Sequence, residues 1–198
     1  MWRQLLKNAI IVSINKLLIT KNKYLFDWRK SLYKDDSLTL HTDLYQINMM
    51  QVYFNQGIHN KKAVFEVYFR QLPFKNGFAV FAGLERIVNY LENLTFSETD
   101  IAYLKDLGYP KDFLDYLANL KLELTINSAL EGDLVFANEP IFQVEGPLAQ
   151  CQLVETALLN ILNYQILIAT KAARIRSVIE DAPLLEFGTR RAQEMDAA

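Results

Sequence analysis

The chain has few of the residues that mark a disulfide scaffold, a zinc site or a nucleic-acid-binding surface. Its single cysteine, Cys151, excludes an internal disulfide, fits a reducing cytoplasm and is expected to pack in the core. The only histidines are His41 and His59, and no CxxC pair is present, so the sequence offers no zinc-binding pattern. The formal net charge of −2 excludes the broad positive field of nucleic-acid-binding proteins.

The first 34 residues differ from the rest in charge. They carry eight Lys or Arg residues against one Asp, whereas the remaining residues are acidic overall. The apolar run at residues 9–19 is interrupted by polar residues and is too short for a membrane span. A targeting sequence and a basic amphipathic helix on a membrane surface stay open. We favour an appended segment, residues 1–34, that takes no part in the fold.

From residue 36 onward, the pattern of apolar residues and turn signals predicts mixed helices and strands. Helices are expected over residues 44–54, 83–94, 97–107, 110–120 and 148–179, the last divided in two near residues 160–163. Ser97 and Asp100 resemble a capping box. Strands are expected over residues 63–70, 78–81, 122–125, 130–136, 141–144 and 184–187. The strands within residues 122–144 are expected to form a small antiparallel unit.

Two short stretches place polar groups where a core does not require them. In the first, around Asp43, a helix N-cap is the simplest explanation. The second, FGTRR at 187–191, follows the last expected strand. Its arginines match carboxylate or phosphate oxygens and Phe187 can stack on a flat ring, although a pair of surface arginines explains the pattern equally well. The residues alone therefore indicate a site for a ring and an anion, without a complete catalytic set.

At these residues the sequence resembles the nicotinate phosphoribosyltransferases. The matching segments are LHTDLYQINM at 40–49, VFEVYFRQLPF at 64–74, FAVFAGL at 78–84, GPLAQCQLVETALLNILNYQ at 146–165, IATKAARI at 168–175 and EFGTRRAQ at 186–193. The resemblance implies an α/β fold class: an α+β N-terminal domain at 35–147, leading into the helical block and first strand of an irregular α/β barrel at 148–198. It covers only the first part of the enzyme, so we expect the chain to be truncated.

The resemblance also implies an activity. The family makes nicotinate mononucleotide from nicotinate and phosphoribosyl pyrophosphate in NAD salvage, with ATP hydrolysis through a phosphohistidine and with Mg²⁺. It implies a cytoplasmic, homodimeric enzyme, of the ligase or glycosyltransferase type, with active sites shared between subunits and with no nucleic-acid or membrane partner. The phosphohistidine is expected beyond Ala198, so no catalytic residue or metal ligand is expected here, and the chain alone is expected to be inactive.

Individual binding residues follow from the same resemblance. Phe187 matches the aromatic residue that stacks on the pyridine ring, and Arg190 matches the arginine that lines the nicotinate and ribose-phosphate pocket. Tyr45 matches the tyrosine that closes the opposite ring face from the partner subunit, beside the acidic Asp43. Thr189 and Arg191 are candidates by adjacency. The alternatives are a non-catalytic binding or dimerisation module derived from the enzyme and, less favoured, the related nicotinamide-using enzyme.

Overall fold

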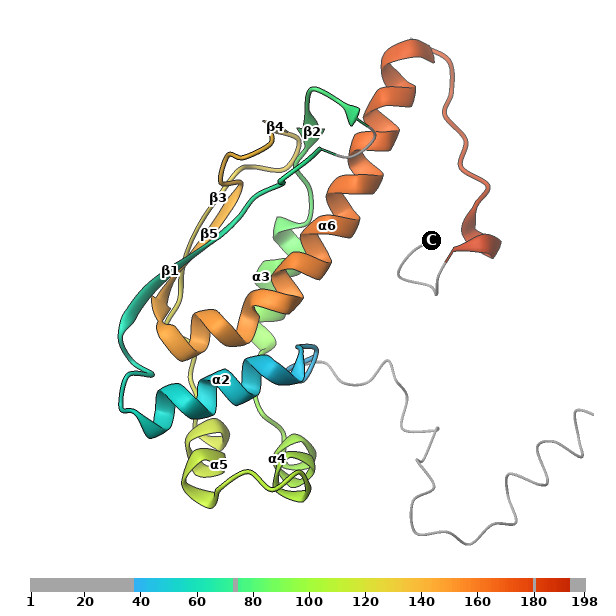
Figure 1. Cartoon of the computed structure of the whole chain (residues 1–198). Helices are drawn as coiled ribbons and strands as arrows, with labels where there is room; N and C mark the ends of the chain where they lie inside the picture. Colours follow the sequence, from blue (N-terminus) through green and yellow to red (C-terminus); the bar gives the residue numbers. More distant parts are fainter. Residues whose placement is uncertain (1–37, 73–74, 180, 193–198) are drawn as a thin grey trace, which may run out of the picture. The chain divides into compact units, whose positions relative to one another are not determined.

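The computed structural model describes residues 38–72, 75–179 and 181–192, and Figure 1 shows how their helices and strands are arranged. The basic segment at 1–34 lies outside the described residues, so its role stays a prediction. The helices are α2 (Leu44–Asn55), α3 (Leu84–Asn93), α4 (Glu98–Asp106), α5 (Lys111–Ala118) and α6 (Leu148–Ile179), followed by the 3₁₀ helix η2 (Thr189–Arg191). The strands are β1 (Lys62–Val67), β2 (Ala79–Val80), β3 (Thr125–Ser128), β4 (Leu134–Val135) and β5 (Phe142–Pro147).

The strands form two antiparallel sheets. The larger has the order β1-β5-β3, and the smaller pairs β2 with β4. Val144 at the centre of β5 lies opposite Phe65 of β1 and Ile126 of β3, and all three side chains face the core. The mixed helices and strands confirm the expected fold class, an α+β arrangement.

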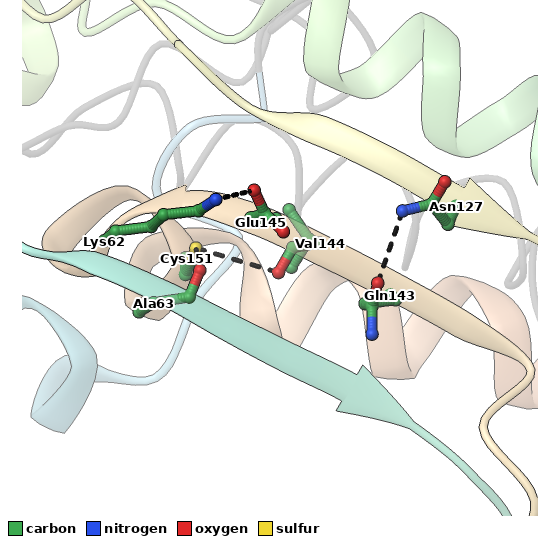
Figure 2. A network of polar contacts seen from close by, with 7 residues as sticks. All are labelled: Lys62, Ala63, Asn127, Gln143, Val144, Glu145 and Cys151. Carbon is green, nitrogen blue, oxygen red and sulfur yellow. Dashed lines mark hydrogen bonds and ion pairs between the residues drawn. The ribbon is translucent and has the colours of Figure 1, made fainter.

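The outer face of the larger sheet carries a row of polar side chains (Figure 2). Gln143 of β5 accepts a hydrogen bond from Asn127 Nδ2 at 3.3 Å and donates to Glu66 at 3.1 Å, each from the directly opposite position. Lys62 forms an ion pair with Glu145. Strands with one apolar and one polar face are typical of an antiparallel sheet covered on one side.

Helix α6 covers the inner face of the sheets. It packs against α2, α3, β1, β2 and β5, and its buried side chains run from Ala149 to Thr170. Cys151 is fully buried there, as expected, with its Sγ 3.9 Å from the carbonyl oxygen of Val144 (Figure 2). Burial raises the pKa of this thiol. By length and composition α6 could cross a membrane, but its side chains from Ala149 to Thr170 include the buried ones that pack in this core.

Local signals place most helix ends where the sequence predicts them. The capping box of α4 is present: Asp100 N donates to Ser97 Oγ at 3.1 Å, and Ser97 N donates to Asp100 Oδ2 at 2.8 Å. Gly83, with a φ of +112°, precedes α3. Its backbone N–H and that of Leu84 both donate to the carboxylate of Glu131. An acidic residue distant in the sequence therefore accepts hydrogen bonds from backbone N–H groups that the helix itself leaves unpaired.

Two expectations about helices and strands are wrong. Residues 148–179 form one helix, because Asn160 and Asn163 lie on its exposed side and no Gly or Pro interrupts it. The three strands expected within 122–144 do not form one unit. β3 begins only at Thr125, β5 pairs with both β1 and β3, and β4 pairs with β2. Helix α6 shares one core with the strands, and the expected division into domains at 147/148 stays a prediction.

The expected strand at 184–187 is also wrong. These residues adopt no regular secondary structure, and the side chains of Leu185 and Phe187 are 70% and 77% exposed. A strand needs a neighbouring strand to satisfy its backbone groups. No strand of the described residues pairs with this segment.

Candidate functional site

Asp43 lies at the N-cap position of α2, but its side chain does not cap the helix. Its carboxylate instead accepts a hydrogen bond of 3.0 Å from the hydroxyl of Thr156 on α6. The predicted position of Asp43 is therefore confirmed, while the predicted side-chain cap is wrong. The carboxylate ties the start of α2 to α6 and remains exposed to solvent.

Tyr45 follows in the first turn of α2, with half of its side chain exposed. Its hydroxyl oxygen accepts a hydrogen bond of 3.1 Å from Gln46 Nε2. Desolvation, followed by the negative charges of Glu155 and Asp43, raises the pKa of Tyr45 above its ordinary value. The phenol is therefore neutral at physiological pH, and its hydroxyl hydrogen is available to a ligand.

Two glutamines behind Tyr45 were not anticipated from the sequence. Gln46 and Gln152 are both buried, and Gln152 Nε2 donates to Gln46 Oε1 between α2 and α6. Gln152 also accepts from the Tyr53 hydroxyl at 3.2 Å and donates to Glu155 at 3.1 Å. The only signal in the sequence is the presence of glutamine among the mainly apolar residues of each helix's inner face.

The residues before α2 are joined to α6 as well. The hydroxyl of Thr42 donates to the carbonyl oxygen of Leu153 at 3.2 Å, and His41 Nε2 lies 3.1 Å from Asn160 Oδ1. His41 is exposed and has a partner on α6. Residues 41–46 are thus fixed along α6 by a series of side-chain hydrogen bonds.

The second predicted stretch, FGTRR at 187–191, lies beyond the C-terminal end of α6, within residues 184–192. Phe187 and Arg190 are exposed, and the hydrogen bonds of the stretch are mainly local, such as Arg191 N to Gly188 O at 2.7 Å. In the described part of the chain, no hydrogen bond, ion pair or ring contact joins Thr189, Arg190 or Arg191 to the residues around Tyr45. One copy of the chain therefore does not bring the two parts of the predicted pocket together.

A cavity of about 440 Å³ lies between the end of β1 and α6, and its lining includes Arg70, Asn160 and Asn163 but none of the predicted site residues. Within residues 38–72, 75–179 and 181–192, no three His, Cys, Asp or Glu side chains are grouped to hold a metal ion.

The comparison with known families decides what this fold belongs to. The family model for the nicotinate phosphoribosyltransferase (NAPRTase) N-terminal domain matches residues 40–163. The chain belongs to the nicotinate phosphoribosyltransferase family. The nicotinate phosphoribosyltransferase of Bacillus subtilis is 64% identical over 167 residues, which are 84% of this chain and 34% of that protein. That of Caenorhabditis elegans is 47% identical over 165 residues, which are 80% and 29% of the two chains.

Solved structures agree with the sequence relatives. The crystal structure of human nicotinic acid phosphoribosyltransferase matches with a TM-score of 0.74 and 38% identity, over 79% of this chain and 32% of that one. Nicotinate-nucleotide pyrophosphorylase from Pyrococcus furiosus, at a TM-score of 0.61 and 24% identity, covers 80% of this chain and 34% of that one and shares the fold. The chain spans about a third of the length of the nicotinate phosphoribosyltransferases that it matches. The family resemblance is confirmed, while the roles of individual site residues stay predictions.

Proposed function

We propose that this chain supplies the N-terminal part of a nicotinate phosphoribosyltransferase, which makes nicotinate mononucleotide from nicotinate and phosphoribosyl pyrophosphate for NAD synthesis. The observation that carries the proposal is the 64% identity over 167 residues to the Bacillus subtilis nicotinate phosphoribosyltransferase. Coupling to ATP hydrolysis, a requirement for Mg²⁺ and a cytoplasmic location belong to the same proposal.

The described residues contribute binding and orientation. The half-exposed ring of Tyr45 covers one face of the pyridine ring, and Phe187 covers the other. Holding the ring between two aromatic side chains fixes its plane and brings its nitrogen to the ribose carbon that it attacks. The exposed guanidinium groups of Arg190 and Arg191 bind carboxylate or phosphate oxygens, and the neighbouring Thr189 hydroxyl can donate to the same group.

The two aromatic residues come from different copies of the chain in this proposal. Helix α2 has apolar side chains on both faces: Ile47 and Met50 are buried, while Leu44, Met49 and Val52 on the other face are exposed. A helix that is apolar on both sides is typically covered on both sides. This exposed apolar face supports a homodimer, in which the proposal places Phe187 of one copy against Tyr45 of the other.

A chimeric enzyme tests this function. The full 198-residue chain is joined to the remaining part of the Bacillus subtilis enzyme, and nicotinate mononucleotide formation is measured with nicotinate, phosphoribosyl pyrophosphate, ATP and Mg²⁺. We expect turnover, and we expect Phe187→Ala to raise the KM for nicotinate about two- to tenfold, because stacking contributes roughly 0.5–1.5 kcal/mol.

The matched control is Phe136→Ala, which removes another exposed phenylalanine and should leave the KM unchanged. A folded, dimeric chimera without turnover, measured beside active Bacillus subtilis enzyme, would refute the proposal. That result would favour the alternative, a non-catalytic binding or dimerisation module.

A further inference from the structure

The Tyr45 hydroxyl stands at the end of a buried chain of side-chain amides. Tyr53 donates to Gln152, Gln152 donates to Gln46, and Gln46 donates to Tyr45. Both glutamines are buried, although glutamine is among the residues that are usually exposed. Two apolar side chains could fill the same space between α2 and α6 without burying polar groups. The amide pair therefore calls for an explanation beyond packing.

The direction of each hydrogen bond in this chain is fixed. The carboxylate of Glu155 can only accept, so it must face the Nε2 group of Gln152, whose Oε1 then faces the Tyr53 hydroxyl. The second N–H of Gln152 points to Gln46 Oε1, which turns the Nε2 of Gln46 toward Tyr45. The Tyr45 oxygen is thus occupied as an acceptor. Among the described residues its own hydrogen has no acceptor, so it is free to donate to a ligand.

We propose that Gln152 is a positioning residue that, through Gln46, fixes the Tyr45 hydroxyl as a hydrogen-bond donor directed at the nicotinate site. The assignment of a nicotinate site beside Tyr45 rests on the proposed function. The amide chain itself involves no substrate and can be tested without one. The raised pKa of Tyr45 agrees with this arrangement, because only the neutral phenol can donate.

A second glutamine on α6 provides a matched control. Gln150 is buried to the same extent as Gln152 and makes two hydrogen bonds, from Glu123 N at 2.7 Å and to Lys121 O at 3.0 Å. Its partners are backbone groups that do not lead to Tyr45. If the buried amides only support the structure, Gln150 and Gln152 should behave alike toward Tyr45.

The first experiment uses the full 198-residue chain with tyrosine labelled with ¹³C at Cζ. Tyr45→Phe identifies the Tyr45 resonance. We expect Gln152→Met and Gln46→Met to move this resonance toward the position of a solvent-exposed tyrosine, and Gln150→Met to leave it in place. Gln152→Met should add nothing once Gln46→Met is present, because both act through one path.

Tyr53→Phe keeps the experiment decisive if a glutamine variant does not fold. It removes only the hydroxyl that orients Gln152, and a smaller movement of the Tyr45 resonance is expected. An unmoved resonance in Tyr53→Phe and in every folded glutamine variant would overturn the proposal.

The second experiment measures the consequence for the reaction in the chimeric enzyme. Gln152→Met should raise the KM for nicotinate about fivefold, with a smaller change in kcat, because a misdirected hydrogen bond costs about 1 kcal/mol. Gln150→Met should leave the KM unchanged. If the Tyr45 resonance moves but the KM does not, the positioning has no role in the reaction and the proposal is overturned. A chimera without any turnover refutes the proposed function instead, and the labelled chain still shows whether Gln152 orients Tyr45.

Discussion

The two stretches that carry the predicted site residues are held very differently by the fold. Residues 41–46 are bonded to α6 at several points, from His41 to Gln46. Residues 184–192 extend beyond α6 with exposed apolar and basic side chains and mainly local hydrogen bonds. Binding sites work best when packing fixes their side chains in advance. Only the first stretch therefore has its geometry set within one copy of the chain.

The buried face of α6 explains the difference. Between Ala149 and Thr170 this face packs on the sheets and on α2, but after Thr170 none of the helix side chains described is buried. Residues that follow the helix have no described surface to pack on. The order of the second stretch must come from whatever covers it, and a second copy of the chain would do so under the proposed function.

The largest expected contrast is in stability, between the buried face of α6 and residues 184–192. Leu153→Ala should lower the free energy of unfolding by about 2–5 kcal/mol, because it removes a fully buried side chain and leaves a cavity. Leu185→Ala is the matched variant and should change it by less than about 0.5 kcal/mol. Urea unfolding followed by circular dichroism measures both. A similar loss of unfolding free energy in the two variants would show that residues 184–187 are packed, and the two segments would then not differ.

The parts of the fold that sequence predicts well depend on neighbouring residues. Helix α2 ends before Gly57, whose φ is +66°, and α4 starts at the capping box of Ser97 and Asp100. Strand pairing depends on distant partners instead, so the partner of β4 and the missing strand at 184–187 could not be read from local patterns. The supposed break in α6 failed for a related reason, since only the tertiary fold places Asn160 on the exposed side.

The candidate site divides in the same way. Asp43 and Tyr45 stand out in the sequence because they belong to a segment that resembles the family. Gln46 and Gln152 could not be connected from the sequence, because they are 106 positions apart and meet only when α2 packs on α6. A glutamine on an apolar helix face indicates a buried polar contact, but it does not indicate the partner.

A hydroxyl at the start of α4 and one in residues 184–192 give a smaller contrast. Ser97→Ala should lower the free energy of unfolding by about 1 kcal/mol, because it removes the side chain that accepts from Asp100 N at the start of α4. Thr189→Ala removes an exposed hydroxyl that caps no helix and should have no measurable effect. Thermal and urea unfolding of the two variants under the same conditions provide the comparison. If Thr189→Ala lowers the free energy of unfolding as much as Ser97→Ala does, residues 184–192 contribute to the stability of the fold.

The smallest contrast concerns a basic side chain of β1 and one of residues 184–192. Lys62 forms an ion pair with Glu145 across β1 and β5 (Figure 2), whereas Arg190 is exposed in the second stretch. Because the Lys62 side chain is 73% exposed, solvent screens this pair, and Lys62→Ala should cost no more than about 0.5 kcal/mol. Arg190→Ala should cost nothing. High salt should abolish the effect of Lys62→Ala, since screening weakens exposed ion pairs. A loss that persists at high salt would instead point to the packing of the Lys62 stem on the sheet.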